Sequence, residues 1–186
     1  MTSIITTPPA IEPVTIADAR LHLRVTHTDE DALISRLIEA ARAHVEQATR
    51  RALITQGWRL YLDAWPPGRI IRLPVSPVQR IDAVTVYDAD GMPVALDPGA
   101  YTLDGASSPA RVRVHAGAPA AANGVEIDFI AGYGDEAGSV PAALVQAILL
   151  LVGQWYEFRE AGSELATAGI PFGFDALTAG YRAPRL

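Results

Sequence analysis

Apolar residues recur every three or four positions in two long segments of the chain, as they do on one face of an α-helix. In the first segment, residues 31–51, this stripe consists of Ile34, Leu37, Ile38, Ala41, Val45 and Ala48. Acidic residues at 29–31 precede the stripe, and Thr28 is a candidate N-cap. Arg50 and Arg51 follow the stripe, where the helix dipole favours positive charge. The pattern predicts a helix of about five turns.

The second helical segment begins at Pro141, because proline is favoured at the first position of a helix. Its main apolar stripe is Leu144, Ile148, Leu151, Trp155 and Phe158. An adjacent stripe consists of Val145, Leu149, Val152 and Tyr156. A helix that is apolar around more than half of its circumference must be covered on two sides. A shorter helix is predicted from Thr15 through Leu23, with Asp18 completing a capping box.

Between the helical segments the period changes to two, which is typical of half-buried strands. In "GWRLYLDAW", Trp58, Leu60 and Leu62 alternate with polar neighbours. The stretch "DADG", residues 88–91, predicts a hairpin turn. Further strands are expected at "AYTLD", "RVRVHA" and "GVEIDFIAGYG". We therefore expect a small antiparallel β-domain at residues 56–135.

The C-terminal residues 163–186 are rich in Gly and Ala, yet they keep scattered large side chains. Such a segment is typical of a tail that folds when it binds a partner. The candidate docking residues are Ile170, Phe172, Phe174, Leu177, Tyr181 and Arg182. The alternative is a tail that packs back on its own domain.

These patterns predict an α+β fold in which the N-terminal and C-terminal helices form a helical core and a small antiparallel β-domain is inserted between them. The expected parts are an N-terminal helical segment, the β-domain, a C-terminal helix packed on the N-terminal helices, and a flexible tail, at 1–55, 56–135, 139–162 and 163–186. In the two long helices, one set of residues is expected to form the core and the contacts between subunits: Leu37, Ala41, Val45, Leu144, Ile148, Leu151, Trp155 and Phe158.

Composition and charge reduce the number of functional classes to which the chain can belong. The net charge of −6 argues against a protein that binds DNA or RNA through phosphate neutralisation. The absence of cysteine excludes disulfides, thiolate metal sites and cysteine nucleophiles. The N-terminus lacks the features of a secretory signal, and the longest apolar run is shorter than the ~20 residues of a membrane span. We expect a soluble protein with no membrane partner.

The sequence contains few patterns that are typical of catalytic, metal-binding or phosphate-binding sites. The four histidines, His22, His27, His44 and His115, lack a common metal-ligand spacing, although the first two lie near acidic residues in sequence. "GYGDEAG", residues 132–138, could cradle a phosphate, but it lacks the Walker pattern, and a glycine-rich connector is the favoured interpretation. No nucleophile elbow or triad pattern occurs. We expect no enzymatic activity, no catalytic residue, no cofactor and no metal.

Several motifs together resemble one family. In chain order they are "PVTIADARLHLRV", "DEDALISRLIEAARAHVEQATRRALITQGWRL", "IRLPVSPVQRIDAVTVYDADG", "IDFIAGYGD", "VPAALVQAILLLVGQWYEFRE" and "FGFDALTAGYR". This order resembles the head–tail connector (adaptor) proteins of tailed bacteriophages, prophages and gene transfer agents. The resemblance covers nearly the whole chain.

The resemblance implies a structural protein of the virion or phage-like particle, assembled in the bacterial cytoplasm and located at the head–tail junction. Such proteins form a ring of about twelve subunits beneath the portal. Its implied partners are the portal protein, a stopper or other tail-side connector, and further copies of itself. DNA would pass through the ring without sequence-specific binding, and the C-terminal tail would dock on the portal.

Two other interpretations stay open at this stage. One is a small-molecule-binding or enzymatic domain with a cleft between the helices and the β-domain. The other is a generic protein-interaction module whose tail binds an unrelated partner. Stoichiometry, the oligomeric state of the free protein and the kind of particle are not determined by these patterns.

Overall fold

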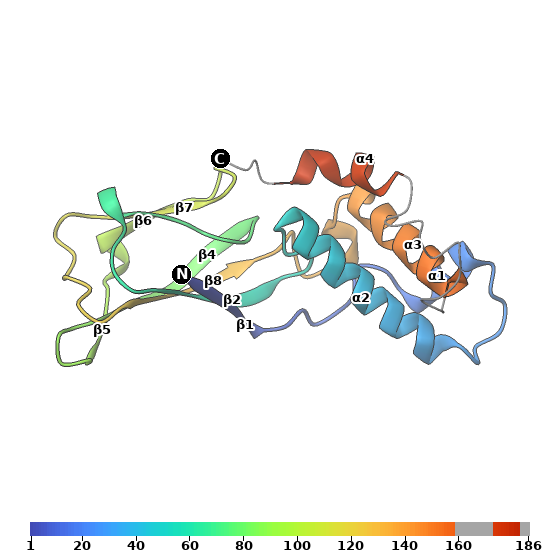
Figure 1. The fold of residues 1–186 in the computed structure, drawn as a ribbon, viewed down its shortest axis with the longest axis horizontal. Coiled ribbons are helices and arrows are strands. Elements are labelled where there is room, and N and C mark those ends of the chain that lie inside the picture. The colour runs from blue at the N-terminus through green and yellow to red at the C-terminus, as the bar shows by residue number, and fades with distance from the viewer. Residues whose placement is uncertain (159–172, 183–186) are drawn as a thin grey trace. The chain divides into compact units, whose positions relative to one another are not determined.

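The computed structural model describes residues 1–158 and 173–182 (Figure 1). Its α+β fold divides into two compact units, each made of two stretches of chain. The β unit contains Met1–Pro9 and Thr55–Tyr133, and the helical unit contains Ala10–Ile54 and Gly134–Leu186. The β unit is therefore inserted between helical segments, as the change of period predicts.

The helical unit is built around the packing of α2 (Asp31–Thr49) against α3 (Ala142–Glu157). The shorter helices α1 (Ile16–Leu23) and α4 (Phe174–Thr178) also contact this pair. A short 3₁₀ turn, Ala179–Tyr181, follows α4. The fully buried apolar side chains of α2 and α3 are Ile34, Ile38, Ala41, Val45, Leu144, Ala147, Ile148, Leu151 and Val152.

The starts of the first two helices differ. In α1 the predicted capping box is present: the Thr15 hydroxyl accepts a hydrogen bond from the Asp18 amide at 3.1 Å, and the Thr15 amide donates to the Asp18 carboxylate at 3.3 Å. In α2 the prediction of Thr28 as N-cap is wrong, because Glu30 occupies that position and no side chain caps the helix. The Thr28 carbonyl instead accepts from the Asp31 amide in the preceding turn.

The β unit contains two antiparallel sheets. The larger has the strand order β1-β2-β8-β4-β5, with bounds Thr2–Thr7, Gln56–Leu62, Val125–Ala131, Val78–Tyr87 and Pro93–Ala95. The smaller has the order β3-β7-β6, with bounds Ile70–Arg72, Arg111–Val114 and Tyr101–Asp104. Short 3₁₀ turns occur at Pro67–Arg69, Pro98–Ala100 and, in the helical unit, Ala137–Ser139.

The alternation of buried and outward-facing residues along the strands produces the core of the β unit. In β8 every second residue is buried, so that Ile127 and Phe129 lie inside while Glu126 and Asp128 face outward. Other strands contribute further fully buried side chains, namely Leu60, Ile71, Val84, Val86 and Val112. The "DADG" hairpin joins β4 to β5 as predicted, with the Gly91 amide donating to the Asp88 carbonyl at 3.1 Å and Gly91 at φ 77°.

The predicted N-terminal boundary is wrong. Residues 1–55 were expected to be a helical segment, but β1 lies at the edge of the five-stranded sheet and pairs with β2, placing residues 1–9 in the β unit. Five of the six residues of β1 are exposed. An edge strand with that exposure has no alternating apolar pattern, so the period of two that marks the other strands is missing here.

The C-terminal region also departs from the expectation of a flexible tail over 163–186. Residues 174–181 form α4 and the following 3₁₀ turn, and α4 contacts α2 and α3. The buried Thr178 hydroxyl donates to the Phe174 carbonyl at 2.9 Å within this short helix. The alternative that the tail packs on its own domain therefore describes these residues.

The glycine-rich segment 132–138 connects β8 to the helical unit. Within the helical unit, a Cβ atom added at Gly134 would lie 2.6 Å from the Ser139 hydroxyl oxygen. Glycine is therefore required here by close packing of the connector, with no need to invoke a phosphate ligand. None of the helices that the structure describes is long and apolar enough to cross a membrane.

Candidate assembly surfaces

The two long helices place the predicted core and inter-subunit residues in two classes. Fully buried in the helical unit are Ala41, Val45, Leu144, Ile148 and Leu151. Leu37 and Trp155 are half-buried, and Phe158 is 41% exposed at the end of α3. The first class is occupied by intramolecular packing, and only the second class has surface left for another subunit.

The candidate docking residues of the tail are also divided. Phe174 is 0% exposed, and its ring centroid lies 5.4 Å from that of His44 on α2. The His44 ring also meets Trp155 edge-on, at 6.0 Å between centroids. Phe174 therefore closes an aromatic cluster of the helical core. In this conformation it is not available to a portal.

The remaining docking candidates among the described residues are more exposed than Phe174. Leu177 and Tyr181 are half-buried, and Arg182 is exposed. The Arg51 guanidinium donates to the Tyr181 carbonyl at 2.7 Å and lies over its ring, 5.7 Å from the centroid. Arg182 forms an ion pair with Asp175. Ile170 and Phe172 lie outside the described residues.

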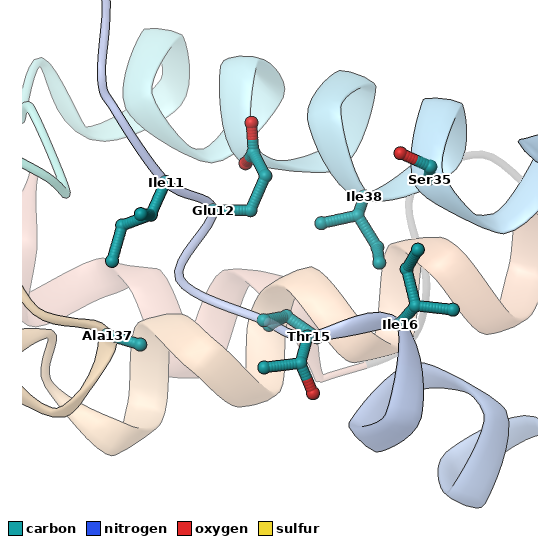
Figure 2. A pocket seen from close by; sticks show the side chains of 8 residues that line it. Ile11, Glu12, Thr15, Ile16, Ser35, Ile38 and Ala137 are labelled. Carbon is teal, nitrogen blue, oxygen red and sulfur yellow. The ribbon is translucent and has the colours of Figure 1, made fainter.

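A second surface is a groove of about 390 Å³ in the helical unit, shown in Figure 2. Ile38 projects into it from α2, while Ile11 and Glu12 come from the extended chain that precedes α1. The other lining residues are Val14, Thr15, Ile16, Ser35 and Ala137. The lining is mostly apolar, which suits an apolar side chain of a partner better than a polar metabolite.

A buried charge network holds this extended chain against α2. The Arg42 guanidinium, with a side chain only 10% exposed, binds Glu12 and Glu46 at 2.8 Å each. Burial lowers the pKa of Arg42, but its hydrogen bonds and charge interactions with the two carboxylates outweigh burial and raise the pKa overall. Glu46 also accepts from the Leu53 amide at 2.8 Å. The network fixes the wall of the groove that Glu12 contributes.

A third surface lies between α1 and α3. Val145 and Leu149, from the second apolar stripe of α3, line a groove of about 360 Å³ with Val14, Asp18, Leu21 and His22. Leu21 is 81% exposed although it is a large apolar residue on a helix. Sequence analysis predicts that α3 must be covered on two sides. In the helical unit α2, α4 and α1 provide most of this cover, and this groove is left open.

On the β unit, charged residues pair across neighbouring strands. Arg59 of β2 binds Asp128 of β8 at 2.6 and 2.8 Å and lies 3.3 Å from Glu126. The hydrogen bonds with Asp128 raise the pKa of Arg59, and a hydrogen bond with Glu126 raises the pKa of Tyr87. These cross-strand pairs satisfy one another and stabilise the sheet.

The β unit also has a groove of its own, of about 580 Å³. Its lining consists of Met1, Leu62, Pro66, Pro67, Ile70, Ile71, Arg72 and Arg111. This groove and its arginines are not among the sites predicted from the sequence. The alternation in "RVRV", which buries Val112 and Val114, was the available signal, since it turns Arg111 and Arg113 outward.

The histidines do not form a metal site in the part of the chain that the structure describes, where no three His, Cys, Asp or Glu side chains come together. His27 lies 3.9 Å from Asp29. His115 is hydrogen-bonded to the Thr102 hydroxyl at 3.0 Å. His44 belongs to the aromatic cluster described above.

Comparison with known proteins identifies the family of this chain. Residues 13–92 match the family model described as phage gp6-like head-tail connector protein. A chain from the neck of an empty gene transfer agent particle, computed with C6 symmetry, is 32% identical to this one, with a TM-score of 0.85 over 100% of this chain and 97% of that one. This chain belongs to the phage gp6-like head–tail connector family.

Two further structures are similar to this connector along its whole length. One is a chain from the virion of a native gene transfer agent particle, 33% identical, with a TM-score of 0.83. The other is from the neck of a native particle computed with C12 symmetry, 33% identical, with a TM-score of 0.80. In both cases the match covers 100% of this chain and 97% of the other. A search of curated protein sequences found no match.

The family and these similar chains are structural components of virus-like particles rather than enzymes. The resemblance stated from the sequence motifs is thereby confirmed, and so is the assignment of this chain to the head–tail junction of a phage-like particle. The grooves and exposed apolar residues are accordingly candidates for assembly surfaces.

Proposed function

We propose that this connector is one subunit of a ring of about twelve copies, seated beneath the portal and joining the capsid to the tail while DNA passes through. The observation that carries the proposal is the full-length match to a neck chain in a particle computed with C12 symmetry. C6 symmetry, used for the neck of the empty particle, is a subgroup of C12 and fits the same number of subunits.

A closed ring needs two different surfaces on each subunit, one for each neighbour. The helical unit offers the groove that contains Ile38 and the groove beside Leu21, both mostly apolar. Exposed apolar surface of this kind typically marks a protein–protein contact. We assign these grooves, with Leu37, Trp155 and Phe158, to contacts with neighbouring subunits.

The portal is the proposed partner of the C-terminal segment. Because Phe174 is buried, docking would use the exposed face of α4 and Arg182, together with Ile170 and Phe172, which lie outside the described residues. A stopper or other tail-side connector is the proposed partner on the opposite side of the ring. Many weak contacts, repeated around the ring, would add up to stable attachment.

The role is structural and needs no catalytic residue. The net charge of −6 suits a subunit of a DNA conduit, because repulsion keeps phosphates from adhering while the DNA moves. Sequence-specific DNA binding is not part of the proposal.

The test is co-purification with the portal protein encoded by the same particle, followed by native mass spectrometry. We expect a complex whose mass corresponds to a multi-copy ring of the full-length chain on the portal. A chain that stays monomeric and does not bind the portal at any concentration contradicts the proposal.

The docking role of the tail needs point variants. A chain ending at Gly162 would lack Phe174 and therefore part of its own core, so lost binding would have two explanations. Ala176→Arg and Arg182→Glu alter exposed positions instead. We expect both to weaken portal binding with little change in thermal unfolding, because the Arg182–Asp175 ion pair is exposed. Unchanged binding would move the docking site away from α4. Arg36→Glu, on the exposed face of α2, is the matched control.

A further inference from the structure

The β4–β5 hairpin, whose strands are labelled in Figure 1, carries a run of apolar residues at 92–95 that its turn at 88–91 does not require. Met92 is 61% exposed and Val94 is 39% exposed, and Pro93 and Ala95 between and beside them are exposed as well. A run of four exposed apolar residues is unusual on a soluble surface and typically marks an interaction site.

The same tip carries acidic groups. The Asp88 carboxylate accepts hydrogen bonds from the amides of Asp90 and Met92, at 3.0 and 2.8 Å, and so forms the turn. The Asp90 side chain contributes nothing to the turn, because only its amide is used. The hairpin tip, defined as residues 88–95, therefore combines two negative charges with an apolar run.

The three-stranded sheet has the opposite character. Its register places Arg72 directly opposite Arg111 and places Ile70 opposite Arg113. Arg111 binds Asp104 at 2.8 Å, but among the described residues neither Arg72 nor Arg113 has an ion-pair partner. Like charges directly opposite each other destabilise a sheet, so folding alone does not account for this arrangement.

The basic groove is the name we use for the 580 Å³ groove in which Arg72 and Arg111 accompany apolar residues. Its apolar lining is Met1, Leu62, Pro66, Pro67, Ile70 and Ile71. It thus has the composition that the hairpin tip would need in a receptor: a pocket for Met92 and positive charge for Asp90. After Asp104 is counted, Arg72 and Arg111 leave one positive charge in the groove. Arg113, two residues from Arg111 on the same outward face of β7, adds a second positive charge beside the groove, against the two negative charges of the tip.

The two features are different surfaces of the β unit. The hairpin tip belongs to β4 and β5 of the five-stranded sheet, whereas most of the groove is lined by residues of the three-stranded sheet and of the segment that precedes β3. A contact between two different surfaces of identical subunits is head-to-tail, and head-to-tail contacts generate rings when the rotation closes.

We propose that the hairpin tip of one subunit docks in the basic groove of the next, with Met92 among the apolar residues and Asp90 paired with Arg72 and Arg113. This inference rests on the proposed ring and names one of its contacts. A second copy of this chain fits better than DNA, because a phosphate backbone has no apolar group to fill a groove lined by prolines, isoleucines and a methionine.

Cysteine cross-linking tests the contact directly, since the chain contains no cysteine. Asp90→Cys and Arg113→Cys chains are mixed in the full-length protein, alone and on the portal, and treated with a short bismaleimide. We expect cross-linked dimers in the mixture and none with either variant alone, because a head-to-tail contact never brings two copies of one position together. Glu39→Cys, at an exposed site on α2, replaces Asp90→Cys in the control mixture.

Charge reversal tests the energetics. Asp90→Arg is expected to abolish the multi-copy complex, and so is the joint change of Arg72→Glu and Arg113→Glu. The chain with all three changes is expected to regain the complex, because the ion pairs re-form with opposite polarity. Glu39→Arg makes the same change in net charge as Asp90→Arg and is expected to leave assembly intact.

The outcomes separate this inference from the proposed function. If the wild-type chain assembles while the mixture yields no dimer, or while both reversals assemble normally, the hairpin contact is wrong and the ring stands. Cross-linking of Asp90→Cys with itself would indicate a two-fold contact and would overturn the inference. If the wild-type chain never assembles, the proposed function fails and the inference fails with it.

Discussion

The helical unit and the β unit differ in the exposure of two large apolar residues. In the helical unit Phe174, a residue that sequence analysis assigns to docking, is fully buried beside His44. In the β unit Met92, which directly follows the predicted turn at residues 88–91, is 61% exposed. Large apolar residues in a glycine-rich segment are thus not necessarily docking anchors. Exposure, which depends on what packs nearby, identifies the better candidates.

The largest expected effect is a loss of stability in the helical unit, and it tests whether Phe174 belongs to the core. Phe174→Ala would empty the space beside His44, and deleting a buried phenylalanine side chain costs about 3–5 kcal/mol. We expect the free energy of unfolding to fall by that amount in urea denaturation followed by circular dichroism. Phe158→Ala, at a 41% exposed site, is the control and should change stability far less. Equal and small effects would mean that α4 does not belong to the core.

The second prediction concerns the polar support of the same unit. Arg42→Ala leaves Glu12 and Glu46 without their shared partner, and breaking a buried ion pair from one side costs about 3 kcal/mol or more. We expect that loss in chemical denaturation, and increased amide exchange at residues 11–15. Arg36→Ala, on the exposed face of α2, should be nearly neutral. Unchanged exchange at 11–15 would show that the network does not hold this segment.

The third prediction tests the β side, where we expect almost no stability effect. Met92→Ser replaces an exposed side chain, and such surface changes usually alter stability by less than about 0.5 kcal/mol. The free energy of unfolding should therefore match that of the unmodified chain, while assembly into the multi-copy complex is reduced. A loss of several kcal/mol would show that Met92 packs within its own subunit, as Phe174 does.

The smallest expected effect concerns the pKa of the Asp104 carboxyl. Hydrogen bonds from Ser107, and then the bond and charge of Arg111, lower the pKa of the Asp104 carboxyl below its ordinary value. Because the lowered pKa belongs to the folded state, the stabilisation is present above the unfolded-state pKa and is lost as pH falls through the folded-state pKa. NMR titration of Asp104 should show the depressed pKa, and Ser107→Ala should raise it. An identical pKa in that variant would contradict the assignment to Ser107.

Much of the fold could be predicted from local patterns. The three-and-four spacing of α2 and α3, the Thr15 capping box and the "DADG" hairpin all depend on residues close in sequence, and each appears in the structure. The strand β1 could not be found in this way, because its exposed edge position removes the alternating pattern. The prediction of Thr28 as N-cap was wrong because Thr28 lies in a separate turn before Glu30, which occupies the N-cap position.

The candidate assembly surfaces were harder to predict from the sequence than the helices and strands. Leu144 and Trp155 belong to one stripe of α3, yet Leu144 is buried and Trp155 is half-buried. The basic groove joins Arg72 and Arg111, which are far apart in the chain and meet through the register of β3 and β7. A local pattern contains no information about such pairings.

By itself the sequence determined the alternation of helical and strand segments, the absence of cysteine chemistry and, through the order of its motifs, the connector family. These properties depend on periodicity, composition and short motifs, which are local. Only the tertiary structure decided that residues 1–9 join the β unit, that Phe174 is core and that Met92 is surface. Burial is a property of the neighbours that a side chain meets after folding, and most of those neighbours are distant in sequence.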